Sequence, residues 1–268
     1  MNALENLTPQ MDSLREDIPA VLLVGGLGTR LRPVLSSTPK PLAPIGDIFF
    51  LELLILQLRS QGIRHLVMCT GHQAERIEQE FGDGHKWDVT IHYSRESSPL
   101  GTAGALKLAS HYVSGDSDFL VMNGDSFLQL DIRQFIRFHR ERGGWASIAV
   151  CKISDASRYG TVYLDESFRV AGFREKLGVH EPGVINGGVY VFNRAILQQI
   201  PDGIVSLEKD ILPRMIEHGV YALEQHGMFI DIGTPEDYAR AQALQSSLCE
   251  AAISESQLGS KENPPRRP

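Results

Sequence analysis

The feature that most constrains this chain is a short apolar run that leads directly into a glycine-rich turn. The run Ala20–Val24 is followed at once by Gly25-Gly-Leu-Gly-Thr-Arg-Leu31. A continuous apolar run bounded by glycines is typical of a buried parallel strand. The turn after it can bring backbone N–H groups close to phosphate oxygens, and Arg30 adds a planar cationic donor. The sequence therefore predicts an α/β fold with an anion site after its first strand.

Strand and helix patterns alternate along the first half of the chain. Strand-like runs occur at 65–69, 89–93 and 118–123. Helical patterns lie between and after them, at 49–58, 73–81, 102–113 and 132–142. This alternation is typical of βαβ units, in which helices cover both faces of a mainly parallel sheet.

After Gly144 the pattern becomes strand-rich. Strand-like segments follow one another closely at 146–150, 160–164, 169–173 and 184–192. A helical pattern returns at about 207–217, and a strand is expected near Phe229. Thr234, Pro235 and Asp237 are typical of the start of a final helix. We expect a Rossmann-like three-layer α/β sandwich with a mostly parallel mixed central sheet and a small β-rich insertion.

Composition and the chain ends limit the remaining possibilities. The 26 basic and 33 acidic residues leave a net charge of −7, which argues against non-specific binding to nucleic acid or a membrane surface. No apolar run reaches the roughly 20 residues that cross a bilayer. The three widely spaced cysteines argue against a disulfide framework, so the cytoplasm is the expected compartment. We expect one domain at 18–248, between a flexible extension at 1–17 and a disordered tail at 249–268.

A second motif, Pro39-Lys-Pro-Leu-Ala-Pro44, holds Lys40 in a stretch stiffened by prolines. A lysine on a rigid loop beside a phosphate cradle would act as a charge clamp. Two familiar phosphate motifs do not fit: the dinucleotide fingerprint needs a third glycine where Leu31 stands, and the P-loop pattern has no match. On these two motifs alone, a structural turn with an exposed lysine remains an alternative.

A series of motifs in order resembles the signature of sugar-1-phosphate nucleotidyltransferases, also called NDP-sugar pyrophosphorylases. It comprises GGLGTRLRP at 25–33 with TPKPLAPI at 38–45, PLGTAGA at 99–105, NGD at 123–125, FREK at 173–176 with INGG at 185–188, and DIGTP at 231–235. The resemblance spans about 20–241. Within the family the chain looks most similar to D-glycero-D-manno-heptose 1-phosphate guanylyltransferases, then to mannose-1-phosphate guanylyltransferases. Hexose thymidylyl-, cytidylyl- and uridylyltransferases are more distant.

The resemblance implies transfer of a nucleoside monophosphate from an NTP to a sugar 1-phosphate, which gives an NDP-sugar for polysaccharide or glycoconjugate synthesis. The sugar phosphate attacks the α-phosphorus and pyrophosphate leaves. No covalent nucleophile or general base is needed, so catalysis would be positioning plus charge stabilisation. The implied catalytic residues are Arg30, Lys40, Asp125, Lys176 and Asp231. Of these, Asp125 and Asp231 would hold Mg²⁺, the expected cofactor.

The resemblance also implies two binding regions. The nucleotide would contact Leu23, Gly25, Gly26, Gly28, Thr29, Arg30, Lys40, Glu96, Pro99, Gly101, Thr102, Asn123 and Gly124. The sugar would contact Tyr159, Gly160, Glu175, Lys176, Asn186 and Gly187, within a sub-region at about 145–192. GTP is favoured, because an ionised Glu96 could accept hydrogen bonds from both donors on the Watson–Crick edge of guanine. Backbone groups of the loop are an alternative reader of the base.

Two other classes of function are weighed against this one. A catalytically silent homologue that binds nucleotide sugars would be favoured by the loss of Arg30, Lys40, Asp125 or Asp231, and all four are present. An NAD oxidoreductase would need the missing third glycine and an acidic ribose partner after the second strand. The expected partners are therefore an NTP and a sugar 1-phosphate, without nucleic acid or membrane, and a homo-oligomer is left open.

Overall fold

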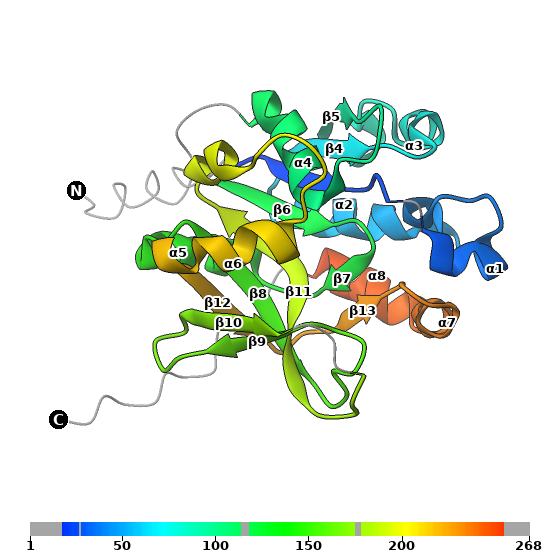
Figure 1. Cartoon of the computed structure of the whole chain (residues 1–268). Coiled ribbons are helices and arrows are strands. Elements are labelled where there is room, and N and C mark those ends of the chain that lie inside the picture. The colour runs from blue at the N-terminus through cyan, green and yellow to red at the C-terminus, as the bar shows by residue number, and fades with distance from the viewer. Residues whose placement is uncertain (1–17, 27, 114–117, 175–177, 255–268) are drawn as a thin grey trace, which may run out of the picture.

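The structure is a computed structural model that describes residues 18–26, 28–113, 118–174 and 178–254. A nine-stranded sheet forms its centre (Figure 1). One half of the sheet has the order β5-β4-β1-β6 and is entirely parallel. Its strands are β1 (Ala20–Leu23), β4 (His65–Thr70), β5 (Thr90–Arg95) and β6 (Phe119–Asn123). These are the four strands that the sequence patterns predict in the first half of the chain.

The other half of the sheet is mixed. Its strands are β8 (Ala146–Ile153), β9 (Thr161–Leu164), β10 (Val170–Arg174), β11 (Gly183–Phe192) and β12 (Val220–Gln225). β11 lies antiparallel to both β6 and β8, while β12 lies parallel to β8. Only β10 and β11 run against the common direction, so the sheet is mostly parallel, as predicted. The expected β-rich insertion extends this same sheet.

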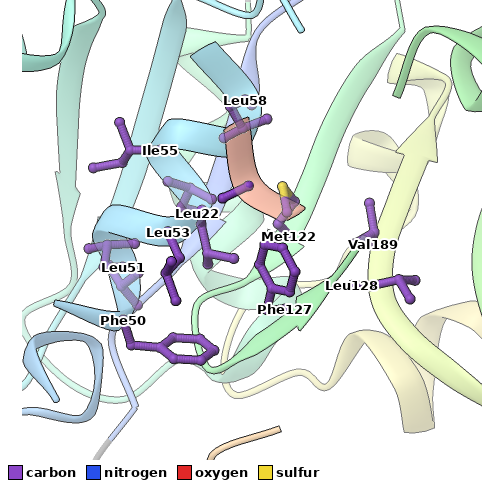
Figure 2. Close-up of a cluster of buried hydrophobic side chains, with 14 of the residues drawn as sticks. Leu22, Phe50, Leu51, Leu53, Ile55, Leu58, Met122, Phe127, Leu128 and Val189 are labelled. Carbon is purple, nitrogen blue, oxygen red and sulfur yellow. The ribbon is translucent and has the colours of Figure 1, made fainter. Parts of the chain in front are cut away.

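Helices cover both faces of the sheet, because alternate strand residues point to opposite sides. Leu22 and Met122 face one core, together with the buried face of α2 (Figure 2). Val21 and Val121 face the second core, on the side of α4. The helices are α1 (Arg32–Leu35), α2 (Phe50–Ser60), α3 (Ala74–Phe81), α4 (Gly101–Leu108), α5 (Ile132–Arg142), α6 (Leu212–Met215), α7 (Pro235–Ala243) and α8 (Gln245–Ile253). This confirms the three-layer α/β sandwich.

Two expected helices are interrupted. The segment 102–113 forms α4 and then a 3-10 turn at Ala109–Tyr112. The segment 207–217 divides into a π-helical turn at Leu207–Ile211, α6, and a 3-10 turn at Ile216–His218. Pro213 lies at this division, and a proline inside a helix has no N–H to continue the hydrogen-bond pattern. The sequence pattern did not indicate either change of helix type.

The C-terminal boundary is a correction. The expected tail from 249 is wrong for its first residues, since α8 continues through Cys249 to Ile253 and packs on α2. Leu248, Ala251 and Ala252 are its buried residues, and their spacing is that of one helix face. Residues 255–268 and the expected extension at 1–17 lie outside the described part of the chain. Within that part, no helix is long and apolar enough to cross a membrane.

Two small pairs of strands complete the fold. β2 (Pro44–Ile45) and β3 (Ile48–Phe49) form a hairpin that begins at the last residue of the proline-rich stretch. β7 (Ser126–Leu128) follows β6 directly and pairs antiparallel with β13 (Phe229–Asp231). At the start of α7 the Thr234 side chain accepts a hydrogen bond from the Asp237 N–H, which confirms the predicted cap.

Candidate active site

The carboxyl ends of β1, β4, β5 and β6 meet at one edge of the sheet and border a cleft of about 840 Å³. The glycine-rich turn after β1 forms one wall, and the segment 95–105 forms another. Ligands of open parallel sheets bind outside the carboxyl ends of the strands. This cleft is therefore the candidate site for the predicted chemistry.

The predicted nucleotide-binding residues all line this one cleft. They are Leu23, Gly25, Gly26, Gly28, Thr29, Arg30, Lys40, Glu96, Pro99, Gly101, Thr102, Asn123 and Gly124. Asp125 also lines it, and Gly233 contributes from the turn after β13. The cleft is also lined by residues that no sequence motif assigns to it, namely Cys69, His72, Arg95, Ser97 and Ser98. Their positions at or just after β4 and β5 were the available signal.

The glycine-rich turn lies directly against Lys40. Gly28 has φ 57°, which is strained for other residues, and a Cβ there would lie 3.2 Å from Lys40 Cβ. The following residues, Thr29–Leu31, form a single 3-10 turn with Arg30 exposed toward the cleft. Lys40 begins another 3-10 turn, and its side chain is only 11% exposed. The two cations are therefore presented by short, tight turns on the same side of the cleft.

Lys40 forms an ion pair with Asp125. Lys40 Nζ donates to Asp125 Oδ2 over 2.6 Å. Asp125 follows Gly124, whose N–H donates to the Leu23 carbonyl over 2.9 Å. A Cβ at Gly124 would lie 2.5 Å from Val24 Cγ1, so a larger residue would push the end of β6 away from β1. The close approach of the two strands thus places Asp125 beside the turn that carries Arg30.

Asp231 is more than a hundred residues away from Asp125 in the sequence but lies next to it in the fold. In the β7–β13 pair Asp231 lies opposite Ser126, and the Ile232 N–H donates to the Asp125 carbonyl over 3.0 Å. Burial, and then the charge of Asp125, raise the pKa of the Asp231 carboxyl. Its Oδ1 is buried without a hydrogen-bond partner among the described residues. A buried carboxylate oxygen without a partner is costly, and a bound cation would offset that cost.

The donor set fits a divalent cation held jointly with substrate. Asp125 and Asp231 supply hard carboxylate oxygens, the type of ligand that Mg²⁺ takes. In the part of the chain that the structure covers, no group of three or more His, Cys, Asp or Glu side chains could hold a metal ion. Phosphate oxygens would therefore have to complete the coordination, as is usual for Mg²⁺ at nucleotide sites.

Glu96 folds back over the ends of two strands. Its N–H donates to the Thr70 carbonyl, and its Oε2 accepts a 3.0 Å hydrogen bond from the Leu100 N–H. A Cβ at Gly71 would lie 2.5 Å from Glu96 Oε1. The carboxylate therefore closes the loop from 96 to 100 and also faces the cleft. Its role in reading the base stays a prediction.

The predicted sugar residues that the structure describes lie outside the lining of this cleft. Asn186 is at a bulge in β11, where its Oδ1 accepts from the Gly188 N–H and its Nδ2 donates to Tyr190 Oη. A Cβ at Gly187 would lie 2.5 Å from Leu128 Cδ2, so this strand packs closely against β7. Glu175 and Lys176 lie outside the described residues.

Tyr159 and Gly160 precede β9, and Tyr159 lies next to β13. The ring of Tyr159 packs edge-on against Phe229, with ring centroids 5.9 Å apart. Burial, followed by the charge of Asp231, raises the pKa of Tyr159 to about 12. A Cβ at Gly160 would lie 3.3 Å from the Arg174 carbonyl oxygen, which brings the ends of β9 and β10 together. Tyr159 is thus near Asp231 and outside the lining of the cleft.

Comparison with known proteins agrees with this geometry. The sequence pattern of the family described as Nucleotidyl transferase matches residues 19–247. D-glycero-alpha-D-manno-heptose 1-phosphate guanylyltransferase of Aneurinibacillus thermoaerophilus is 39% identical over 225 residues, which cover 83% of this chain and 96% of that protein. Mannose-1-phosphate guanylyltransferase of Mycobacterium tuberculosis is 36% identical over 230 residues, 84% of this chain. This chain spans 64% of that protein's length, and 62% of the length of the Drosophila pseudoobscura mannose-1-phosphate guanylyltransferase catalytic subunit beta.

Solved structures share the fold. The crystal structure of HddC from Yersinia pseudotuberculosis in complex with GMP-PN is 33% identical, with a TM-score of 0.76, and the match covers 84% of this chain and 98% of that one. A Bacillus anthracis structure described as a glucose-1-phosphate thymidylyltransferase has a TM-score of 0.77 at 22% identity, which supports the fold alone. The resemblance and the fold predicted from the sequence are therefore confirmed, and the chain belongs to the nucleotidyl transferase family.

Proposed function

We propose that the protein transfers GMP from GTP to a sugar 1-phosphate, with D-glycero-α-D-manno-heptose 1-phosphate as the favoured acceptor. The observation that carries the proposal is that Arg30, Lys40 and Asp125 line one cleft, with Asp231 next to Asp125. Two anionic substrates repel each other, so a catalyst must supply cations and fixed N–H dipoles where they meet. The glycine-rich turn and these four side chains provide both.

Each residue has a distinct task in this proposal. Backbone N–H groups of Gly25, Gly26, Gly28 and Thr29 cradle the triphosphate, and Arg30 binds the β and γ phosphates and steadies the pyrophosphate as it leaves. Lys40 neutralises charge at the α-phosphate and orients Asp125 through their ion pair. Lys176 would hold the attacking sugar phosphate. The sugar phosphate is itself the nucleophile, so the protein orients it in line with the α-phosphorus.

A divalent metal is part of the proposal. Nucleotidyltransferases of this family generally use one, and we assign Mg²⁺ to the Asp125–Asp231 pair. When bound, it would neutralise charge on the phosphates. The two carboxylates would fix its place at the end of β6, next to Lys40.

The choice of GTP and of the sugar rests on the relatives and on Glu96. The guanylyltransferase relatives named above are 36–39% identical to this chain, and Glu96 faces the cleft beside the loop that begins α4. Mannose 1-phosphate is the alternative acceptor, supported by the Mycobacterium tuberculosis relative. The cytoplasm belongs to the same proposal, supported by three cysteines that are all unpaired thiols.

The test is a matrix of ATP, CTP, GTP, UTP and dTTP against a panel of sugar 1-phosphates that includes the heptose, mannose and glucose compounds. Pyrophosphate release is read as phosphate after addition of pyrophosphatase. The proposal predicts phosphate only when GTP, a manno-configured sugar 1-phosphate and Mg²⁺ are present together. Activity with UTP or dTTP and none with GTP would reject the base assignment alone. Nucleotide binding without any pyrophosphate release would favour the silent homologue instead.

A further inference from the structure

A chain of hydrogen bonds runs behind the cleft from the start of α4 to the bulge in β11. Thr102 Oγ1 donates to Glu208 Oε2 over 2.9 Å, and Tyr190 Oη donates to Glu208 Oε1 over 3.4 Å. Asn186 Nδ2 in turn donates to Tyr190 Oη over 2.8 Å. One carboxylate therefore connects a residue that lines the nucleotide cleft with the strand expected to contact the sugar.

Glu208 is held firmly at the centre of this chain. It lies in the π-helical turn Leu207–Ile211, and such turns are frequent at functional sites. Its Oε2 also accepts a hydrogen bond from Ser206 Oγ, and the Leu207 N–H donates to Thr102 Oγ1 over 2.7 Å. The two segments are thus joined by both side chains and backbone.

The backbone just before this π-helical turn packs directly against the start of α4. The Val205 N–H donates to the Leu100 carbonyl, and the Val205 carbonyl accepts from the Ala103 N–H. A Cβ at Gly101 would lie 2.5 Å from the Val205 carbonyl oxygen, so only glycine permits this contact. The loop that lines the nucleotide cleft therefore takes its position from the segment that carries Glu208.

Tyr190 is the second junction of the network. Its side chain is completely buried, and it also shares a hydrogen bond with Asn123, which lines the cleft at the end of β6. Burial, and then the charge of Glu208, raise the pKa of Tyr190 well above its usual range. The hydroxyl therefore stays protonated and can donate to the carboxylate while it accepts from Asn186.

We infer that Glu208 is a positioning residue that couples the two substrate sites, by holding Thr102 of the nucleotide loop and Tyr190–Asn186 of the sugar strand in one rigid arrangement. The inference rests on the proposed transfer between GTP and a sugar 1-phosphate. In-line attack depends on the relative placement of both substrates, and a misplacement of about 1 Å can cost about a hundredfold in rate. Glu208 touches neither substrate in this role and acts through Thr102 and Tyr190.

The kinetic test compares Glu208→Gln with the matched control Glu217→Gln, an exposed glutamate in the next turn. Glu208→Gln should lower kcat about tenfold and raise KM for both GTP and the sugar 1-phosphate about tenfold, with an unchanged Tm, while the control leaves all three constants at the wild-type value. A purely structural role would lower Tm or the active fraction and would leave both KM values unchanged, which would overturn the inference.

A double-mutant cycle isolates the coupling. Thr102→Val and Tyr190→Phe each remove one hydroxyl of the network, and their effects on kcat/KM should be strongly non-additive in the wild-type background. In a Glu208→Ala background the same two changes should become additive, because the connecting carboxylate is gone. Additive effects in the wild-type background would overturn the inference.

A measurement without substrate separates this inference from the proposed function. Amide hydrogen exchange at 100–104 should become faster in Tyr190→Phe and in Glu208→Gln, although neither change lies in that segment. Unchanged exchange there would overturn the coupling. Failure of the wild-type protein to release pyrophosphate with every substrate pair would instead reject the proposed function, and the exchange result would still decide the coupling.

Discussion

Buried polar groups at the two edges of the central sheet differ in whether they have hydrogen-bond partners. At the carboxyl edge, buried side-chain atoms without hydrogen-bond partners in the described chain gather at or near strand ends: Thr70 Oγ1, Ser94 Oγ, Asn123 Oδ1, Ser126 Oγ and Asp231 Oδ1. At the amino edge, buried His139 is hydrogen-bonded to Ser147, and its Nε2 lies 3.5 Å from Asp118, which also accepts from Arg140.

This difference in hydrogen bonding distinguishes an edge that serves function from an edge that serves stability. Unpartnered buried polar groups cost folding free energy and are rare in native proteins, so their concentration at one edge indicates a ligand site. Buried polar groups that are hydrogen-bonded, as at the other edge, do not have this free-energy cost and contribute to stability. β6 joins the two, with Asp118 before its first residue and Asp125 after its last. Changes at the carboxyl edge should therefore affect catalysis, and changes at the amino edge should affect unfolding.

The largest effect is expected for Asp231→Asn. Because we propose Asp231 as a metal ligand, its loss should lower kcat/KM for pyrophosphate release roughly a thousandfold. The same change removes a buried charge next to Asp125, so the metal-free protein should be no less stable than wild type in urea unfolding. Mg²⁺ with GTP should raise the Tm of wild type far more than that of the variant. A variant that unfolds easily but keeps its activity would contradict the contrast between the edges.

Arg30→Ala should follow, with a loss of about a hundredfold in kcat. Arg30 is exposed in a short turn, so its removal should change the free energy of unfolding by less than about 1 kcal/mol. Arg32→Ala is the matched control, because Arg32 is exposed two residues later and does not line the cleft. Unfolding of Arg30→Ala, measured by circular dichroism, would make Arg30 structural and would weaken the phosphate assignment.

Lys176→Ala tests whether the carboxyl edge has separate nucleotide and sugar halves. We expect KM for the sugar 1-phosphate to rise about thirtyfold and the dissociation constant of GTP to change little, since charge-assisted phosphate contacts contribute about 1.5–3 kcal/mol. Initial rates over a grid of both substrates, together with calorimetric GTP binding, measure the two effects. An equal loss for both substrates would reject the specific role of Lys176 in holding the sugar phosphate.

Glu96→Gln should have a smaller effect, about a tenfold fall in kcat/KM for GTP with an unchanged Mg²⁺ requirement. Glutamine can still accept from the Leu100 N–H, but its amide would present a donor where guanine needs an acceptor. Glu80→Gln on α3 is an exposed matched control. Equal activity of Glu96→Gln and wild type with GTP would assign base reading to the loop backbone instead.

The sequence could predict β1, β4 and β6 because each is mostly an apolar run buried on both faces, and it could predict the edge strand β5 from its alternating pattern. It could also have extended the last helix, since Leu248, Ala251 and Ala252 have helical spacing. The π-helical turn at Leu207–Ile211 and the strand β12 depend on tertiary packing, against α4 and against β8 respectively. No local pattern encodes such contacts.

The site residues also divide into those that the sequence could predict and those that only the fold brings together. Arg30 and Lys40 lie in local motifs that predict tight turns. Their roles were implied by the family resemblance. The adjacency of Asp125 and Asp231 results from the register of β7 against β13, which spacing along the chain does not reveal. Glu208 has no signal in the sequence, because an isolated glutamate in a helical pattern resembles a solvated residue, and only the fold brings Thr102 and Tyr190 to it.

Asp118→Asn is expected to have the smallest effect on catalysis and a clear effect on stability. The hydrogen bond from His139 is the main cause that lowers the pKa of Asp118, and Arg140 contributes as well. A carboxyl whose pKa is lower in the folded state stabilises the fold above its unfolded pKa of about 3.9, and this contribution is lost as the pH falls through the folded value.

Urea unfolding should therefore place the free energy of unfolding of Asp118→Asn about 1–2 kcal/mol below that of wild type at pH 6. The gap should begin to narrow below about pH 4, where the carboxyl becomes protonated in the unfolded chain, and should close as the pH falls through the lower folded pKa. Pyrophosphate release by the variant should match wild type at 25 °C, because Asp118 lies at the edge of the sheet opposite the cleft. A loss of activity without a loss of stability would show that the two edges are coupled through β6.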